Sequence, residues 1–371
     1  MMAKIRVGVV GVGHLGRHHA RILKSIDGVE LVGVVDSRIE QARAIAEPLG
    51  VQAFDNYHDL IGKVDAVSIA VPTKYHRAVA GAFLEQGIPA LVEKPLTSTV
   101  QEGEELVALA NRAGVVLQVG HIERYNPIFE TLQALPIRPR YLAAERLSTY
   151  TFRSTDIGVV LDLMIHDIDL VLSLIDSPVS AVSSVGTSVF GGAEDVASAR
   201  VWFQDGTVAD LSASRASLHA TRKMRVWGQE GYVGVDFKTR EALVVTPSEM
   251  LRNGELSLDG VDLSKPDDVK NHIFGTVLKV DQKTAAGAEQ LALELEDFIR
   301  AVRTGIPPRV TGADGLRNMR LAELIIEGLQ QHAWAPSGAK SSVPQLANGI
   351  PAPHILRPRV SKPESHRLPL Q

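Results

Sequence analysis

The glycine-rich sequence GVGHLG at residues 11–16 constrains this chain more than any other local feature. It directly follows the apolar run Ile5–Val10 and leads into an amphipathic stretch with helical spacing. Gly11 permits a tight turn, Gly13 lets a ligand approach the backbone, and Gly16 allows the helix to pack closely on the strand. Amides at the start of such a helix stabilise a diphosphate. The pattern predicts a strand–turn–helix unit that binds a dinucleotide.

A carboxylate follows this unit where a dinucleotide site needs one. The apolar run Leu31–Val35 ends at Asp36, about 20 residues beyond the turn, where a carboxylate can bind the ribose hydroxyls of adenosine. The strand, the helix and Asp36 together argue against a glycine turn that serves packing alone. Because Asp36 should repel the additional phosphate of NADP, NAD is the expected cofactor. Arg38 could still reach that phosphate, which leaves NADP as the alternative.

The bulk properties exclude several other classes of protein. The 371 residues suffice for two domains, and the net charge of −4 comes without a long Lys/Arg run, so we expect no nucleic-acid partner. The chain has no cysteine, which excludes disulfides, thiolate nucleophiles and Cys-ligated zinc, and we expect no metal. The first residues lack the pattern of a signal peptide, and no stretch approaches the length of a membrane span. We therefore expect a cytoplasmic protein.

Residues 1–122 alternate short apolar runs with amphipathic stretches, a pattern typical of parallel strands connected by helices. The expected strands are Ile5–Val10, Leu31–Val35, Ala66–Val71, Ala90–Val92 and Val115–Val119. The expected helices are Leu15–Ile26, Ile39–Leu49, His76–Gln86 and Val100–Ala113. We therefore predict an α/β domain of the Rossmann type, with a doubly wound parallel sheet.

The pattern changes in residues 123–334, for which we predict an α+β domain with antiparallel strands and helices. The pairs Asp205-Gly206 and Glu230-Gly231 each separate two strand-like runs, as hairpin turns do. The expected helices are Gly158–Ile175, Glu289–Thr304 and Gly315–His332. Residues 335–371 are rich in Pro, Ser and Gly, and we predict a flexible tail.

Lys94 is the first candidate for a catalytic role. The sequence Glu93-Lys94-Pro95 closes an expected strand at its carboxyl end, where open α/β sheets bind ligands. A lysine there can polarise a hydroxyl or stabilise an alkoxide while hydride leaves the carbon. The motif alone leaves open an ordinary lysine on a surface loop.

The second candidate is a polar stripe on the expected helix Gly158–Ile175. At about 100° per residue, Asp162, His166, Asp169 and Ser173 fall on one side of this otherwise apolar helix, and Asp167 lies off the stripe. If the stripe faces a cavity, Asp162 and Asp169 can orient His166 and raise its basicity. The periodicity is equally compatible with a stripe that faces solvent.

The order of these motifs, with Val71-Pro72-Thr73 and His76 between them, resembles the Gfo/Idh/MocA family of NAD(P)-dependent sugar dehydrogenases over nearly the whole chain except the tail. The resemblance implies a second domain with a largely antiparallel open sheet, a homodimer or homotetramer, and the catalytic residues Lys94, Asp162 and His166. The residues it implies for the cofactor, together with those of the turn, are Gly11, Gly13, His14, Leu15, Gly16, Asp36, Ser37, Arg38, Val71, Pro72, Thr73, His76, Glu93 and Lys94.

Within this family, the sequence GHIERYNP at residues 120–127 resembles the nucleotide-sugar 3-dehydrogenases. This implies oxidation of the C3 hydroxyl of a UDP-N-acetylhexosamine such as UDP-N-acetylglucosamine, with a ketone that feeds a 3-aminotransferase for lipid A or another surface glycan. Arg124 could bind the diphosphate, and Tyr125 and Asn126 the sugar or uridine. The expected substrate-binding residues are Lys94, His121, Arg124, Tyr125, Asn126, Asp162 and His166. The alternative is that this segment only links the two domains and that Arg124 forms a structural ion pair.

Three rival functions remain open at this point. A UDP-N-acetyl-glucosaminuronate 3-dehydrogenase would need a cation for the sugar carboxylate, with Arg146, Arg153 and Arg215 as candidates. A dehydrogenase of free sugars or inositol is the second rival. A non-catalytic NAD-binding sensor is the third, and it would have no need for Lys94 and His166 together.

Overall fold

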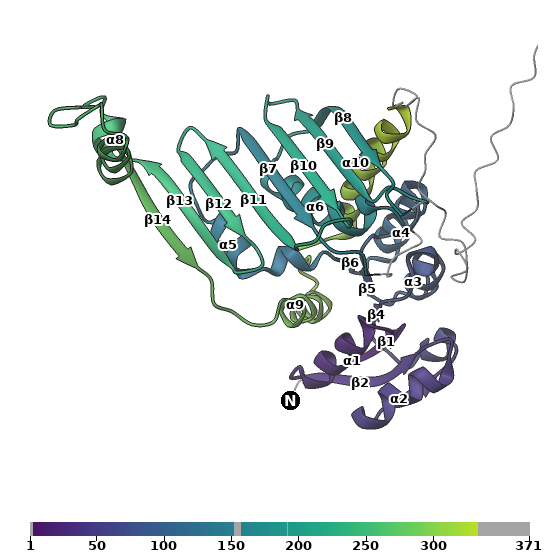
Figure 1. The fold of residues 1–371 in the computed structure, drawn as a ribbon. Coiled ribbons are helices and arrows are strands. Elements are labelled where there is room, and N and C mark those ends of the chain that lie inside the picture. The colour runs from purple at the N-terminus through teal and green to yellow at the C-terminus, as the bar shows by residue number, and fades with distance from the viewer. Residues whose placement is uncertain (1–2, 152–156, 191, 333–371) are drawn as a thin grey trace, which may run out of the picture.

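The computed structural model describes residues 3–151, 157–190 and 192–332, and two sheets organise this part of the chain (Figure 1). The predicted tail, residues 335–371, lies outside the described residues. Among the helices that the structure describes, none is both long enough and apolar enough to cross a membrane.

The first sheet has six parallel strands in the order β3-β2-β1-β4-β5-β6, which confirms the predicted doubly wound fold. The strands are β1 Ile5–Val10, β2 Val29–Val35, β3 Gln52–Phe54, β4 Ala66–Ile69, β5 Ala90–Glu93 and β6 Leu117–Gly120. The helices between them are α1 Gly16–Ser25, α2 Ile39–Leu49, α3 His76–Leu84 and α4 Val100–Ala113. β3 was not predicted, because three residues are too few for an apolar pattern. The strand order reverses between β1 and β4, so the glycine turn after β1 lies at the switch point where such sheets bind ligands.

The second sheet has eight strands in the order β14-β13-β12-β11-β7-β10-β9-β8. Only the β7–β10 pair is parallel among the described strands of this sheet, so the expected largely antiparallel sheet is confirmed. The strands are β7 Tyr141–Leu147, β8 Val179–Thr187, β9 Val196–Phe203, β10 Val208–Ser214, β11 Thr221–Gly228, β12 Gly231–Asp236, β13 Glu241–Pro247 and β14 Leu278–Thr284. Both predicted hairpins form, β9–β10 around Asp205-Gly206 and β11–β12 around Glu230-Gly231.

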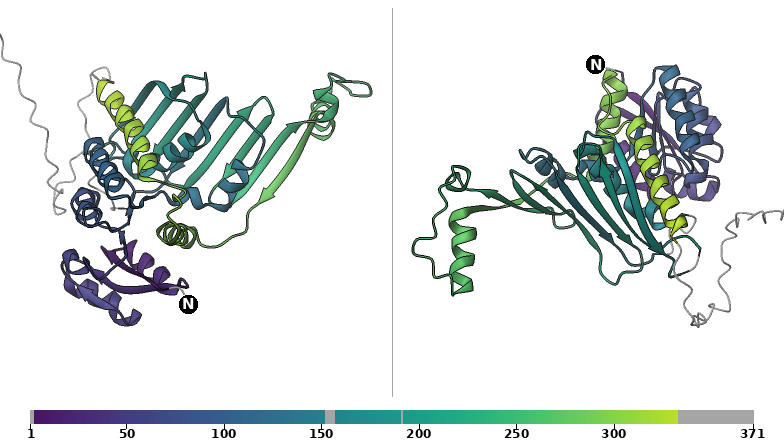
Figure 2. Two further views of the ribbon diagram at one scale, coloured as in Figure 1. Left: turned by 180° about the vertical axis from the view of Figure 1, so that it is seen from behind. Right: turned by 90° about the horizontal axis from the view of Figure 1, so that it is seen from above.

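Helices cover one face of the second sheet and leave the other face open (Figures 1 and 2). The covering helices are α5 Pro127–Gln133, α6 Ile165–Leu174 and α10 Gly312–Gln331. Their apolar side chains share one buried core with alternate residues of the strands, for example Leu142 and Met224. Two short helices, α7 Glu249–Arg252 and α8 Pro266–His272, lie in a projection between β13 and β14.

The chain returns to the first sheet after β14, and this return joins the two parts of the molecule. α9 Gln290–Thr304 packs on α1, where Leu295 and Phe298 share a core with Val7 and Leu23. α10 contacts α4 and β6 on one side and β8 and α6 on the other. The carboxyl ends of the parallel strands are thereby held against α6.

The predicted helix Gly158–Ile175 is not continuous in its hydrogen-bond pattern. A π-helical turn over Val160–Met164 precedes α6, which begins at Ile165. Such turns are rare in proteins, and those that do occur are often found at functional sites. Because the turn is wider than an α-helical one, the stripe drawn at about 100° per residue does not describe the directions of its side chains.

Candidate active site

The glycine turn has the geometry that diphosphate binding requires. Gly11 has φ of +84°, and a Cβ there would lie 2.7 Å from the carbonyl oxygen of Ala70. A Cβ at Gly16 would overlap the carbonyl oxygen of Gly11, so α1 packs against the turn as closely as a glycine allows. At Gly13 no atom lies within 4 Å of the Cβ position, which leaves this backbone open to a ligand. The turn therefore fits the diphosphate of NAD.

Asp36 lies across the turn at the end of β2. Its Oδ2 accepts a hydrogen bond from the amide of Val12 at 3.2 Å, and its Oδ1 accepts one from the amide of Arg38 at 3.1 Å. These two amides orient the carboxylate at the position from which ribose hydroxyls are bound. The other residues predicted to bind the cofactor around this turn are exposed or nearly so: His14, Leu15, Ser37 and Arg38.

His76 ties the loop after β4 to the loop after β5. Its Nε2 lies 2.8 Å from the carbonyl oxygen of Val71, and its Nδ1 lies 2.9 Å from that of Pro95. The side chain is buried, and burial lowers the pKa of His76. His76 was predicted to contact the cofactor. Buried against two backbone carbonyls, it positions the loops that carry Pro72, Thr73 and the Glu-Lys-Pro motif.

Glu93 contacts a buried histidine that the sequence pattern did not reveal. His19 Nε2 lies 3.0 Å from Glu93 Oε1, and His19 Nδ1 lies 2.8 Å from Ser68 Oγ. Burial acts to raise the pKa of Glu93, but His19, Lys94 and His76 outweigh it, so the pKa falls below its ordinary value. Glu93 is therefore an ionised, fixed carboxylate beside Lys94.

Lys94 reaches from the end of β5 to the second domain. Its Nζ lies 2.7 Å from the carbonyl oxygen of Asp162 and 3.4 Å from Oδ1 of the same residue. Both side chains are largely buried, and the Lys94–Pro95 peptide bond is cis. The structure thus brings together two of the three predicted catalytic residues, one from a strand end and one from the π-helical turn.

His166 follows Asp162 by four residues and lies at the start of α6. Its Nδ1 is buried and has no hydrogen-bond partner among the described residues. Burial lowers the pKa of His166 well below its usual value, and the charges of Lys94 and Arg146 lower it further. His166 is therefore a neutral imidazole at neutral pH, able to accept a proton.

The prediction that Asp162 and Asp169 orient His166 and raise its basicity is wrong. Asp162 is engaged by Lys94, and Asp169 binds Arg124 Nε at 2.8 Å and Asn318 Nδ2 at 2.8 Å. Both carboxylates are engaged elsewhere, and the charges of Lys94 and Arg146 act with burial to lower the pKa of His166 rather than raise it.

Arg124 takes the structural role that the sequence left as an alternative. Its Nε and Nη2 both donate to Asp169, and its side chain is 10% exposed. His121 joins the same group, because Asn318 Nδ2 lies 3.1 Å from His121 Nε2. The Nδ1 of His121 is buried without a partner among the described residues, and burial lowers its pKa. His121 is thus a second neutral imidazole in this region.

Tyr125 and Asn126 are not available to a substrate in this structure. The Tyr125 hydroxyl donates to Asp297 at 2.8 Å, and the Asn126 amide donates to the carbonyl oxygen of Phe237 at 3.2 Å. Each side chain is 1% exposed. These two residues were predicted to bind the substrate. In the structure they pack in the interior between the domains, through which the segment after β6 runs.

Arg146 is the centre of a buried charge cluster that the sequence analysis did not identify. Its Nη1 donates to Glu123 at 2.9 Å, and its Nη2 donates to Asp167 at 2.8 Å. All three side chains are nearly inaccessible. The available signal was the alternation of β7, because Arg146 continues the inward series of Leu142 and Ala144.

The arginines considered as binding sites for a sugar carboxylate already pair with carboxylates of the protein, where the structure describes them. Arg146 is engaged by Glu123 and Asp167, and Arg215 Nε donates to Asp195 at 2.7 Å. Arg153 lies outside the described residues. Neither Arg146 nor Arg215 offers a free guanidinium to a ligand.

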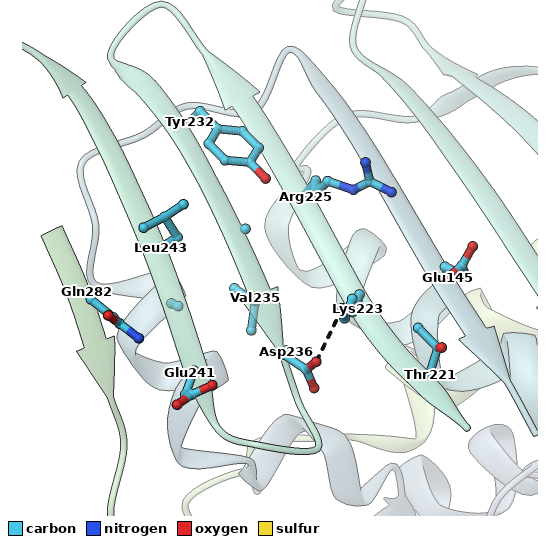
Figure 3. Close-up of a pocket in the computed structure, with 12 residues that line it drawn as sticks. Glu145, Thr221, Lys223, Arg225, Tyr232, Val235, Asp236, Glu241, Leu243 and Gln282 are labelled. Atoms are coloured by element: carbon cyan, nitrogen blue, oxygen red, sulfur yellow. Dashed lines mark ion pairs between the residues drawn. The ribbon is translucent and has the colours of Figure 1, made fainter. Parts of the chain in front are cut away.

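A shallow hollow of about 710 Å³ lies on the open face of the second sheet (Figure 3). Lys223 and Arg225, which line it, alternate along β11 with the buried Met224 and Val226, so the hollow is on the face opposite α6. Its lining residues include none of the predicted site residues. The hollow is therefore separate from Lys94, Asp162 and His166, the residues predicted to be catalytic.

Comparisons with known proteins extend over both sheets. Residues 5–121 match the oxidoreductase family with an NAD-binding Rossmann fold, and residues 137–234 match the Gfo/Idh/MocA C-terminal domain. The chain is 36% identical over 322 residues to UDP-N-acetylglucosamine 3-dehydrogenase of Acidithiobacillus ferrooxidans, covering 86% of this chain and 96% of that protein. It is 27% identical over 341 residues to scyllo-inositol 2-dehydrogenase (NAD(+)) of Bacillus subtilis, covering 86% and 93% respectively.

A solved structure of the Acidithiobacillus ferrooxidans enzyme matches this one with a TM-score of 0.79 at 35% identity, covering 89% of this chain and 100% of that one. The glycine turn, Asp36 and the contact between Lys94 and Asp162 thus lie in a chain that shares its architecture, over 89% of its length, with a known dehydrogenase. This chain belongs to the Gfo/Idh/MocA family of NAD-binding oxidoreductases.

Proposed function

We propose that this protein oxidises the C3 hydroxyl of UDP-N-acetylglucosamine, or of a closely related UDP-N-acetylhexosamine, to the 3-keto sugar with NAD. The observation that carries the proposal is the contact between Lys94 and Asp162, with His166 four residues further along the same helical segment. The substrate class is supported by the 36% identity to an enzyme named for that reaction. Bound NAD supplies the acceptor for the hydride that leaves the sugar carbon.

Lys94 would bind the oxygen of the reacting hydroxyl. An ammonium has three N–H donors, and Asp162 accepts from two of them, at 2.7 and 3.4 Å. The third donor remains for the substrate. As the C–H bond breaks, the positive charge of Lys94 stabilises the negative charge that develops on that oxygen.

His166 would accept the hydroxyl proton. Burial, together with the surrounding cations, lowers its pKa and keeps its ring neutral, and the structure describes no partner for its Nδ1. Asp162 acts on Lys94 in this scheme and not on His166, because its carbonyl and carboxylate oxygens both face the ammonium. In this scheme Lys94 stabilises the negative charge and His166 removes the proton.

The direct test is turnover by the purified protein with NAD and UDP-N-acetylglucosamine, with hydroxylamine present to trap the ketone. We expect NADH to form at a rate that depends on the sugar nucleotide. Parallel reactions contain UDP-N-acetyl-glucosaminuronate, free N-acetylglucosamine and scyllo-inositol. Faster turnover of the uronate would support the first rival substrate, and turnover of inositol alone would overturn the assignment to nucleotide sugars.

The chemistry of the product suggests the next reaction. A 3-keto sugar is an acceptor for an amino group, so a pyridoxal-dependent 3-aminotransferase would consume it and give an amino sugar for lipid A or another surface glycan. We also propose that the reaction takes place in the cytoplasm, where a cell maintains the NAD that it consumes.

The open face of the second sheet is our proposed site of self-association, as a dimer or tetramer. It carries exposed apolar side chains, including Leu243, which lines the hollow of Figure 3, and Val280 on the neighbouring strand β14. Large apolar side chains that remain exposed on a sheet are typical of an interface. Light scattering after size-exclusion chromatography tests this proposal. We expect Leu243→Asp to lower the molar mass of the particle, and a monomeric wild type would contradict it.

A further inference from the structure

Arg222 lies on the side of the second sheet that faces the candidate active site. It is the second residue of β11 and pairs directly with Arg146 of β7. Met224 and Val226, the next residues on the same face, are buried against the core that includes α6. The Arg222 side chain is 54% exposed, because it lies at the end of the strand. An exposed arginine therefore lies beside a buried one at the margin of the site.

The two paired arginines share a single carboxylate unequally. Glu123 Oε1 accepts from Arg146 Nη1 at 2.9 Å but lies 3.5 Å from Arg222 Nη1. Like charges at directly opposite strand positions destabilise a sheet, and Glu123 offsets this repulsion mainly for Arg146. In the described part of the chain, Glu123 is the only hydrogen-bond partner of the Arg222 side chain. A guanidinium has five N–H donors, so most of the binding capacity of Arg222 is unused.

A short chain of contacts connects Arg222 with the catalytic helix. Arg222 contacts Glu123, Glu123 contacts Arg146, and Arg146 contacts Asp167, the residue next to His166. The positive charge of Arg222 also contributes to the lowered pKa of His166. Arg222 is therefore close enough to the site to influence a group bound there. The other arginines considered, Arg124, Arg146 and Arg215, are held by buried carboxylates.

We propose that Arg222 binds an anionic group of the substrate, the role that the sequence had suggested for Arg124. The inference rests on the proposed function. A half-exposed guanidinium with unused donors can bind two anionic oxygens in parallel, as phosphate and carboxylate require. The group is the diphosphate of the UDP moiety, or the sugar carboxylate if the substrate is a uronate.

The test compares Arg222→Gln and Arg222→Lys with the control Arg320→Gln. Arg320 is 55% exposed and forms an ion pair with Glu104 on α4, away from the site. For each protein we would measure kcat and KM for UDP-N-acetylglucosamine, the KM for NAD, the inhibition constant of UDP and the melting temperature. The ratio of kcat/KM for UDP-N-acetyl-glucosaminuronate over UDP-N-acetylglucosamine identifies the anionic group.

We expect Arg222→Gln to raise the UDP inhibition constant and the KM of the sugar nucleotide about 10- to 100-fold, the loss of one or two charge-assisted hydrogen bonds. The KM for NAD should not change, and Arg222→Lys should fall in between. If the UDP inhibition constant of Arg222→Gln is unchanged while its preference for the uronate falls tenfold, Arg222 binds the sugar carboxylate instead of the diphosphate. If Arg222→Gln matches Arg320→Gln in both measurements, the inference is overturned while the proposed function stands. A wild type that neither oxidises UDP-sugars nor is inhibited by UDP overturns both.

Discussion

Lys94 Nζ and the carbonyl oxygen of Asp162 are 2.7 Å apart although the residues are separated by 68 positions in the chain. The first residue directly follows β5 of the parallel sheet, and the second lies in the π-helical turn before α6. The contact therefore connects the two domains. It also holds in place the Lys94 ammonium, for which we propose a catalytic role. The shorter bond is made by the backbone of Asp162 and the longer one by its carboxylate.

This geometry predicts unequal effects for the two side chains. Lys94→Met should lower kcat by about 10²–10³-fold, because the oxygen loses its charged donor. Asp162→Asn should cost only about tenfold, since the carbonyl contact at 2.7 Å does not depend on the side chain. Isothermal titration should show NAD binding retained in both. Full activity of Lys94→Met and of His166→Ala would contradict the catalytic assignment, and a protein with no activity in any form would favour the sensor.

The pH dependence of kcat/KM should report His166. Its pKa in the fold lies below the usual value of about 6.5, so the neutral ring that accepts the proton persists into mildly acidic solution. We expect the rate to be constant at neutral pH and to fall only as the pH drops through this lowered pKa. In Arg222→Gln, which removes one of the nearby cations, the fall should move to higher pH. An acid limb above pH 7 in the wild type would contradict a neutral His166.

Asp36 should determine the choice of cofactor. In Asp36→Ala the repulsion of a 2′-phosphate is removed, and the exposed Arg38 guanidinium, whose Nε is now 3.9 Å from the carboxylate, can turn to that phosphate. We expect the ratio of kcat/KM for NAD over NADP to fall by at least about tenfold. Glu40→Ala is the control, because Glu40 is an exposed carboxylate in the first turn of α2 and is not among the residues expected to bind the cofactor. An unchanged ratio would show that Asp36 only holds the amide of Val12.

Glu294 on α9 should limit stability at high pH. Its side chain is fully buried, its two carboxylate oxygens have no partner among the described residues, and burial raises its pKa well above the ordinary range. The fold therefore retains a proton that the unfolded chain releases, so stability falls as the pH rises from the unfolded-state pKa to the folded-state pKa.

Glu294→Gln removes this effect and should raise the melting temperature, with a gain that grows by about 1.4 kcal/mol per pH unit between those two pKa values. Glu296→Gln, an exposed position on the same helix, is the matched control. Scanning calorimetry from pH 5 to pH 9 measures the difference. A gain that is constant with pH would show that Glu294 is not protonated in the fold.

Local features of the fold were predictable because they depend on neighbours in the chain. The roles of Gly11 and Gly16 follow from backbone geometry at one turn, and the two predicted hairpins of the second sheet follow from a glycine between strand-like runs. Lys94 was identified because a strand end in a parallel sheet has a known location relative to bound ligands. Its contact with Asp162 was not predictable, since it depends on how the two domains pack.

The errors arose where partners come from distant segments. Asp169 was assigned to His166 from helical periodicity, but Arg124 and Asn318 reach it from other elements. Tyr125 and Asn126, which follow β6, were expected to bind the substrate, whereas both are buried and donate hydrogen bonds to Asp297 and to Phe237 respectively. Arg222 was not singled out at all, because only the pairing of β11 with β7 places it beside Arg146.

The proposed reaction oxidises C3 of a UDP-N-acetylhexosamine and transfers the hydrogen of that carbon to NAD. UDP-N-acetylglucosamine that carries deuterium only at C3 tests it most directly, with NADH analysed by mass spectrometry after ketone trapping. We predict that the NADH formed contains the deuterium and that kcat/KM falls relative to the unlabelled sugar. NADH without deuterium, or no NADH at all, would contradict the account.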